Sequence, residues 1–297
     1  MIIFYFKERE EMIADLHTHT TASDGVLTPR QLIGLAWNIG LKVIAITDHD
    51  TVSGLPEGLA AGKECGLEVI PGVELSTEWE DREIHILGYF IDWHHEILRS
   101  FLAQMRQDRW KRLSKMVARL RDLGYDISEE EVKEAARGEA VGRPHVADVL
   151  VKKGYFPDRK TAFLELLERG RKGYVPRRKV EPGEAVEVIL KCGGVPVLAH
   201  PGFSKADWLI PHLVNLGLWG IEVYHPSHDQ EAVERYLQMA RRHNLLITGG
   251  SDFHSPQGEY RLGQCRVGPE EVEKLRWAHR QIIRRKALTY NLTKDLY

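Results

Sequence analysis

Short apolar runs recur along the chain and alternate with stretches of helical periodicity. Most of these runs lack alternating polar positions, which is typical of parallel strands that are covered on both faces. The seven candidate strands are residues 13–17, 43–47, 67–73, 84–89, 195–199, 220–224 and 245–248. The first helix is marked by Thr28 as N-cap, Pro29 in its first turn and Gly40 just past its end. Further helices are predicted at 58–65, 205–216, 229–243 and 269–285. This alternation predicts an α/β fold whose parallel sheet is either open or closed into a barrel.

The regular pattern breaks between about residues 100 and 185. That stretch predicts helices alone, at 101–123, 128–137, 143–153 and 159–168. It holds 20 Lys and Arg against 14 Asp and Glu, so it carries a formal charge of +6 and the rest of the chain −8. We interpret it as a helical insertion between two strand–helix units. Its charge either faces a substrate or is an ordinary solvated surface.

Composition narrows the function classes. The net charge is −2, with 43% apolar and 28% charged residues, which excludes a disordered chain and a globally basic nucleic-acid binder. The three cysteines are widely separated and form no C-x-x-C pair, so neither a thiolate zinc site nor a disulfide framework is indicated. This cysteine usage fits a reducing, cytoplasmic setting. No apolar run in the sequence approaches the roughly 18 residues that a membrane helix needs. Residues 1–11 are expected to form an N-terminal extension outside the core.

Histidines and acids gather at the predicted strand ends. A single histidine there is more often an ordinary polar residue, but every predicted strand delivers a His, Asp or Glu, nearly always at its carboxyl end. They are His17, His19, Asp24, Asp48, His49, Glu74, His85, His200, Glu222, His225, Asp252 and His254. The carboxyl ends of parallel strands are where α/β folds build active sites. Imidazole and carboxylate without thiolate suit Zn, Mn or Fe in a catalytic site. The pattern therefore predicts a metal centre.

Ordered motifs strengthen this interpretation. They are Asp15-Leu-His-Thr-His-Thr20, Thr47-Asp-His-Asp50, Pro71-Gly-Val-Glu74, Ile84-His-Ile-Leu-Gly88, Ala199-His-Pro201 and Gly250-Ser-Asp-Phe-His254. Over about residues 12–254 the chain resembles the PHP (polymerase and histidinol phosphatase) superfamily. The resemblance implies a distorted seven-stranded (β/α)7 TIM-like barrel formed by residues 12–99 and 186–297. Residues 100–185 would be a helical insertion that acts as a substrate lid.

The same resemblance implies two to three divalent ions (Mn, Zn or Fe) and their ligands. A first ion would be held by His17, His19, Glu74 and Asp252. A second would share Glu74 and add His85 and His200, and a third would use Asp24, His49 and His254. Asp24 stands where some members of the family have a further histidine. Asp48, Glu222 and His225 remain for supporting or substrate-binding roles, and Asp48 is expected to orient a ligating imidazole.

Two motifs of the insertion, Gly142-Arg-Pro-His145 and Arg171-Lys-Gly-Tyr-Val-Pro176, resemble the monofunctional phosphoesterase branch of the superfamily. That branch acts on nucleoside 3′,5′-bisphosphates or on short 5′-phosphorylated RNA and DNA. Arg143 and Lys172 are candidates for phosphate binding. His145 is expected either to contact substrate or to cap a helix, and His225 either to protonate the leaving oxygen or to be structural.

A cluster of divalent ions would carry more positive charge than its three carboxylates return, which suits a phosphate dianion. Metal-activated hydroxide would attack phosphorus. The prediction is therefore a metal-dependent phosphoesterase that acts on a nucleotide or short oligonucleotide, with no membrane and no obligate protein partner. Three alternatives stay open: a histidinol-phosphate or other small-molecule phosphatase, an amidohydrolase-type hydrolase, and a metal-dependent nucleic-acid binder without catalysis.

Overall fold

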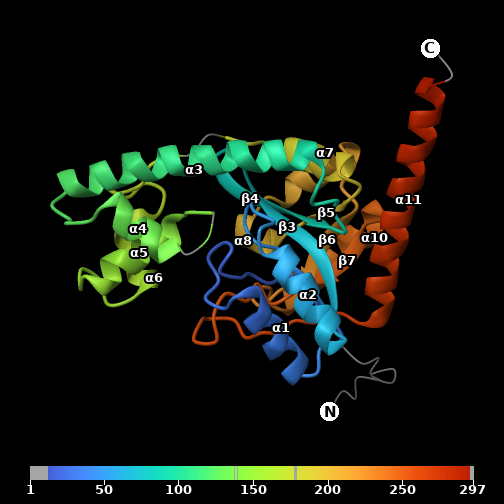
Figure 1. The fold of residues 1–297 in the computed structure, drawn as a ribbon. Coiled ribbons are helices and arrows are strands. Elements are labelled where there is room, and N and C mark those ends of the chain that lie inside the picture. Colours follow the sequence, from blue (N-terminus) through green and yellow to red (C-terminus); the bar gives the residue numbers. More distant parts are fainter. Residues whose placement is uncertain (1–12, 137, 139, 177–178, 295–297) are drawn as a thin grey trace.

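The computed structural model describes residues 13–136, 138, 140–176 and 179–294 (Figure 1). The extension expected at residues 1–11 lies outside the described residues. Seven strands form one sheet in which neighbours in sequence are neighbours in space. They are β1 (Ala14–Asp15), β2 (Val43–Ile46), β3 (Glu68–Trp79), β4 (Arg82–Tyr89), β5 (Val195–Leu198), β6 (Gly220–Tyr224) and β7 (Leu246–Gly249).

The first and last strands approach each other and nearly close the sheet. The amide of Leu16 donates a hydrogen bond to the carbonyl of Gly249 (3.2 Å), and Thr18 forms a parallel bridge with Phe253 just beyond both strands. The α/β barrel predicted from the sequence is therefore confirmed.

The fourth strand differs from the expectation. β4 pairs antiparallel with both β3 and β5, so the sheet is mixed and the all-parallel prediction is wrong. A two-residue turn, Glu80 and Asp81, joins β3 to β4 with φ angles of 42° and 67°. Positive φ at both central residues is the geometry that reverses a tight hairpin. Since the hairpin pairs along its whole length, β3 continues to Trp79, and Glu74 lies in mid-strand rather than at a strand end.

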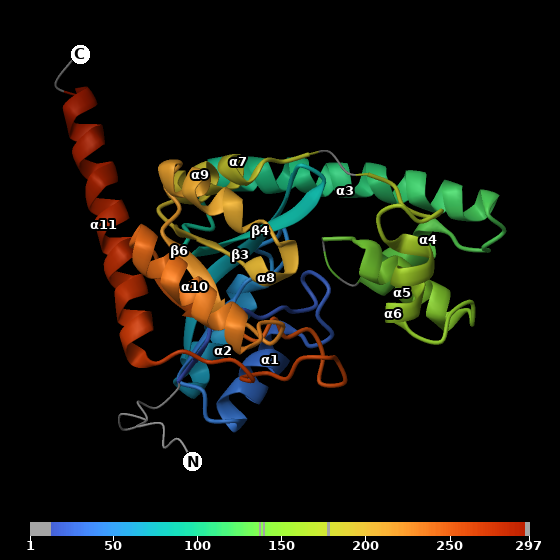
Figure 2. The same ribbon diagram turned by 180° about the vertical axis from the view of Figure 1, so that it is seen from behind.

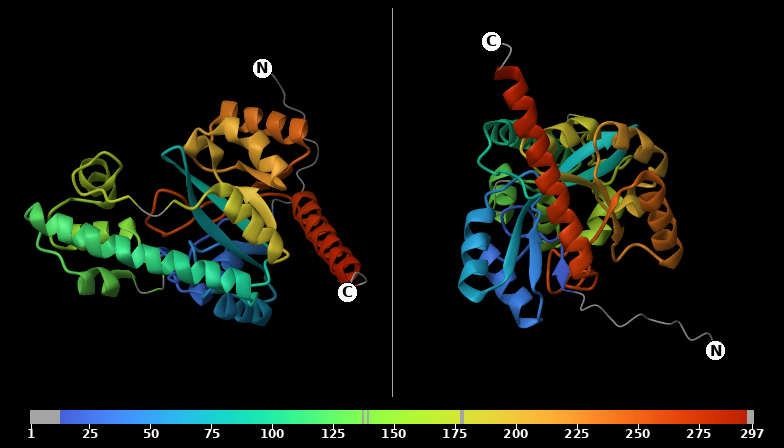
Figure 3. Two further views of the ribbon diagram at one scale, coloured as in Figure 1. Left: turned by 90° about the horizontal axis from the view of Figure 1, so that it is seen from above. Right: turned by 90° about the vertical axis from the view of Figure 1, so that its right-hand side faces the viewer.

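Helices cover the outside of the barrel (Figure 2). They are α1 (Pro29–Asn38), α2 (Leu55–Cys65), α7 (Pro182–Lys191), the short α8 (Pro201–Ser204), η2 (Asp207–Leu209), α9 (Ile210–Asn215), α10 (Gln230–His243) and α11 (Pro269–Lys294). Thr28 forms a capping box with Gln31, as its position predicted. The predicted helix at 205–216 is divided between η2 and α9, and α7 was not predicted. α11 extends beyond the barrel toward the C-terminus (Figure 3). None of the helices in the described part of the chain is long and apolar enough to cross a membrane.

One long helix connects the insertion to the barrel. α3 (Glu96–Asp122) lies along the barrel for its first half, where Leu98 and Leu102 join the barrel core. Its second half places Leu113 and Leu120 in a separate apolar cluster. This cluster is completed by α4 (Glu129–Ala136), α5 (Arg143–Lys152), α6 (Arg159–Ala162) and the π-helix η1 (Phe163–Leu167). The insertion thus has an apolar cluster of its own, joined to the barrel by α3, and the division at residues 100 and 185 stays a prediction.

A buried ion pair anchors the insertion to the barrel. Arg109 of α3 donates to Asp50 just after β2 (2.7 Å from Nε), and also to Ser76 Oγ (3.1 Å) and to the carbonyl of Val141 (3.2 Å). Asp50 is 1% exposed. A buried carboxylate needs such a partner, because an unpaired charge in the interior is strongly destabilising. Arg109 therefore fixes both α3 and the segment before α5 against the strand ends.

Candidate metal centre

Glu74 lies at the middle of a ring of histidines inside the barrel. Its side chain is fully buried, and ring nitrogens of five histidines lie within 3.3 Å of its carboxylate oxygens. They belong to His17, His19, His49, His85 and His200. The histidines reach this point from β1, β2, β4 and β5, so the closed sheet is what gathers them around one carboxylate.

Two further acids extend the cluster. Asp252, just after β7, lies 3.1 Å from His19 Nε2 and 3.4 Å from His17 Nε2. Asp24, in the loop after β1, lies 3.2 Å from His254 Nε2. The donor atoms fall into three groups, each within 4.8 Å across: His17, His19, Glu74 and Asp252; His19, Asp24, His49 and His254; and His49, Glu74 and His85.

These groups are similar to the three ligand sets that the family resemblance implies, with small differences. The first group is the same set. Of the set expected for the second ion, Glu74 and His85 lie in one group, which also contains His49. The third member of that set, His200, places its Nε2 atom 3.0 Å from Glu74. The third set gains His19, which takes part in two groups.

The donor set fits divalent metal ions. Several buried ring nitrogens and carboxylate oxygens make no hydrogen bond to any described residue: His17 Nε2, both ring nitrogens of His19, Asp24 Oδ1, His49 Nδ1 and Glu74 Oε2. Burying polar atoms without partners is costly. Here the unpartnered atoms converge, and their nitrogen and oxygen chemistry suits Zn, Mn or Fe. The cluster could therefore bind metal.

The electrostatics show how strongly these groups are coupled. Burial opposes the ionised form of Glu74, but the surrounding imidazoles, His49 foremost, hold its pKa well below the usual range. Burial likewise disfavours charged His254, but the carboxylates of Asp24 and Asp252 raise its pKa to about 10. In the metal-free chain, protons on histidines therefore balance the buried carboxylates.

Glu222, rather than Asp48, orients an imidazole of the cluster. His17 donates from Nδ1 to Glu222 Oε1 (3.0 Å), which leaves its Nε2 lone pair facing the cluster. The other oxygen of Glu222 accepts from the backbone amide of His200 (2.8 Å). Asp48 instead accepts from the amide and hydroxyl of Thr20 (both 2.7 Å) and from Ser23 (2.6 Å). The expectation that Asp48 orients an imidazole is wrong, because its carboxylate is engaged in shaping the loop that carries Asp24.

Replacing Glu222 with glutamine is expected to weaken metal binding by about 10- to 100-fold. Glutamine keeps only one of the two oxygens that accept hydrogen bonds from the His17 ring and the His200 amide. Metal affinity would be measured by titration against a competing chelator. Glu234→Gln, at an exposed site on α10, is the matched control and should leave affinity unchanged. Equal affinity of Glu222→Gln and the parent protein would show that Glu222 does not position His17.

The remaining candidates lie around the cluster. His225 Nε2 is 3.5 Å from Asp252 Oδ2, and its Nδ1 accepts from the Ser227 amide (3.1 Å). His145 Nδ1 accepts from the Gly142 amide (3.0 Å), which confirms a helix-capping contact at the start of α5.

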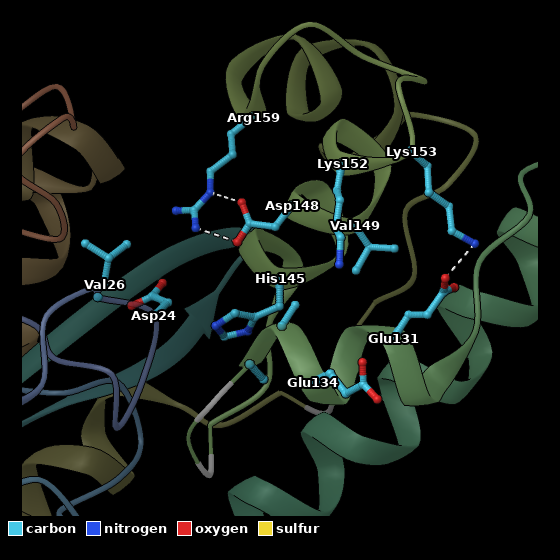
Figure 4. Close-up of a pocket in the computed structure, with 13 residues that line it drawn as sticks. Asp24, Val26, Glu131, Glu134, His145, Asp148, Val149, Lys152, Lys153 and Arg159 are labelled. Carbon is cyan, nitrogen blue, oxygen red and sulfur yellow. Dashed lines mark hydrogen bonds and ion pairs between the residues drawn. The ribbon is translucent and has the colours of Figure 1, made fainter.

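A cavity separates the barrel from the insertion next to Asp24. Its volume is about 660 Å³, and His145 and Lys152 of the insertion face Asp24 and Val26 across it (Figure 4). Asp148 and Arg159 form a two-pronged ion pair on its wall.

The two expected phosphate-binding residues are not among those that line this cavity. Arg143 is paired with Glu83 of β4 (2.8 Å). Lys172 is exposed. Arg177 and Arg178 of the same basic stretch lie outside the described residues.

Comparisons with known proteins agree with this geometry. The PHP domain family matches residues 15–166. A "5′-3′ exoribonuclease Rnm" of Salmonella typhimurium is 38% identical, covering 88% of this chain and 92% of its own length. A "3′,5′-nucleoside bisphosphate phosphatase" of Chromobacterium violaceum is 35% identical over 82% of this chain and 87% of its own. A solved structure from Bifidobacterium adolescentis, provisionally named a metal-dependent phosphoesterase, superposes with a TM-score of 0.84 at 34% identity, covering 90% of this chain and 96% of that one.

Proposed function

Because the chain belongs to the PHP domain family, we propose that it is a metal-dependent phosphoesterase acting on nucleotide phosphate esters. The substrate is a nucleoside 3′,5′-bisphosphate or a 5′-phosphorylated oligonucleotide. Relatives named for both activities cover more than four-fifths of this chain, which supports this substrate class. Separated free cysteines favour a reducing compartment such as the cytoplasm.

The observation that carries the proposal is the convergence of five imidazoles on buried Glu74, flanked by Asp24 and Asp252. Two to three ions of Mn, Zn or Fe fit the three donor groups. When bound, such ions lower the pKa of water toward neutrality and stabilise negative charge on a phosphate. The chain itself supplies the ligands, fixes the tautomer of His17 through Glu222 and buries the ligands in the barrel.

His225 is the proposed proton donor to the leaving oxygen. The Ser227 amide donates to Nδ1 of His225, so the neutral ring carries its proton on Nε2, the nitrogen that faces Asp252. As the proton donor the ring would act in its doubly protonated form, with Nδ1 donating to the Ser227 hydroxyl (2.7 Å) while the Nε2 proton passes to the leaving oxygen.

Residues 100–185 are proposed to form a lid over the substrate. Within it, Arg143, His145 and Lys172 are the candidate substrate contacts. His145 lines the cavity beside Asp24, and Arg109 ties this segment to the barrel rim.

The direct test is phosphate release with Mn²⁺ and Zn²⁺ across a panel of substrates. The panel contains adenosine 3′,5′-bisphosphate, nucleoside 5′-monophosphates, 5′-phosphorylated oligonucleotides and histidinol phosphate. We expect turnover of the bisphosphate or the oligonucleotides to exceed that of histidinol phosphate. A preference for histidinol phosphate would identify a small-molecule phosphatase instead. Release from none of the substrates at saturating metal would overturn the proposal.

A further inference from the structure

A groove lies beside the metal centre, between the barrel and the insertion. Its volume is about 370 Å³, and Phe203 of α8 forms part of the barrel wall. Phe163, Tyr174 and Arg143 line it from the insertion, and Glu83 of β4 contributes from the hairpin. Figure 2 shows α8 on the side of the barrel that faces the insertion. The groove is thus lined by three aromatic rings.

Phe203 is an unusual residue to leave in solvent. It is 70% exposed, the highest value among the large apolar side chains of the described residues. It follows the cluster histidine His200 by three positions, and the two rings are 6.0 Å apart with an edge-on orientation. An exposed aromatic ring therefore borders the metal centre directly.

The turn that carries Phe203 is held from two sides. Arg82 donates to the carbonyls of Ser204 (3.0 Å) and Lys205 (3.1 Å). The amide of Gly202 donates to Nε2 of His228 (3.1 Å), and a Cβ atom at Gly202 would lie 2.6 Å from that ring. The exposure of Phe203 is thus a fixed property of the turn.

The charges of the groove are largely balanced. Arg143 is paired with Glu83 (2.8 Å), and Arg169 with Asp81 (2.6 Å). The guanidinium group of Arg143 also lies 5.5 Å from the centre of the Phe163 ring. Paired guanidinium groups offer flat stacking surfaces and N–H donors rather than free positive charge. Such a groove suits a neutral planar ring with polar edges better than it suits a phosphate.

We propose that this groove binds the nucleobase of the substrate, which stacks on Phe203 while its phosphate occupies the metal centre. The inference rests on the proposed phosphoesterase function and assigns the specificity for nucleotides to Phe203. Stacking on an aromatic side chain tolerates any base, because every base presents a π-face. The groove therefore selects nucleotides over other phosphate esters without selecting a sequence.

The test compares adenosine 3′,5′-bisphosphate with its abasic tetrahydrofuran analogue, which carries the same phosphates. For the parent enzyme, kcat/KM is expected to be higher with the base present. In Phe203→Ala, the ratio of the two kcat/KM values is expected to fall by about ten- to a hundredfold, since one base–aromatic stack is lost. Phe203→Trp should restore the ratio. Trp37→Ala, another exposed aromatic (56%) at the far end of α1, is the matched control.

The outcomes separate this inference from the proposed function. If the parent enzyme hydrolyses both substrates equally, the base groove is overturned and the phosphoesterase stands. An unchanged ratio in Phe203→Ala would overturn the role of Phe203. Hydrolysis of neither substrate nor of the oligonucleotides would contradict the proposed function itself.

Discussion

Replacing Glu74 with glutamine is expected to lower kcat/KM for phosphate release by about a thousandfold or more, because several kcal/mol of charge stabilisation depend on the ions it would hold. The Glu74 carboxylate belongs to two of the three donor sets, as do His19 and His49. Glutamine has nearly the same shape but is neutral, and its amide group would direct hydrogens toward ring nitrogens whose lone pairs are needed for a metal. Both the bound metal and the rate should therefore fall together.

The measurement combines steady-state kinetics with elemental analysis of the dialysed protein. Glu68→Gln, at the first residue of the same strand, is the matched control and should keep both metal and activity, since the Glu68 side chain is exposed and pairs with Arg276. A Glu74→Gln protein with its full metal content and a rate within tenfold of the parent would refute the central position of Glu74.

Much of the metal centre could be predicted from the sequence because its ligands follow local strand signals. His17, His19 and His49 come directly after short buried runs, and closing a barrel brings such positions to one end. The motifs around them carried the resemblance that the comparisons now support. Motifs and short apolar runs are properties of short segments, so they can be recognised in the sequence alone.

The direction of β4 could not be predicted, because strand direction is set by pairing rather than by the pattern within one strand. An apolar run such as 84–89 looks the same in either direction. The turn that reverses the chain, Glu80-Asp81, lacks the glycine or asparagine that usually marks a tight hairpin. Because β4 is antiparallel to both β3 and β5, His85 enters the cluster from a strand that runs opposite to its neighbours.

Side-chain contacts between residues far apart in the chain could also not be predicted from the sequence. Asp48 follows β2 and Glu222 lies within β6, and only the packing shows that the Glu222 carboxylate meets His17. Arg109 and Asp50 are 59 residues apart, and Arg109 belongs to none of the motifs. Phe203 gave one weak signal, an aromatic ring three positions after a strand-end histidine, which acquires meaning only beside the groove.

Removing the metal is expected to lower the melting temperature of the protein by about 5–10 °C. Ions that bind only the folded chain stabilise it by about 2.7 kcal/mol at a free concentration of 100 Kd, and a chain of this size shifts by about 2–4 °C per kcal/mol. The melting temperature would be recorded with Mn²⁺ or Zn²⁺ and again with excess chelator. Returning the metal should restore it. Glu74→Gln should show a much smaller difference, which separates the metal centre from nonspecific effects of the chelator.

The difference is expected to widen as pH rises. In the metal-free chain, neighbouring carboxylates overcome burial and raise the pKa of His49 to about 9 and that of His254 to about 10. A histidine with a raised folded-state pKa stabilises the fold fully below its unfolded pKa of about 6.5 and loses that contribution as pH passes 9 to 10. Bound ions replace those protons, so the metal-loaded protein should not share this loss. Melting temperatures measured at pH 7 and pH 9.5 would test this, and a difference that stays constant or narrows would show that protons and metal do not compete for these histidines.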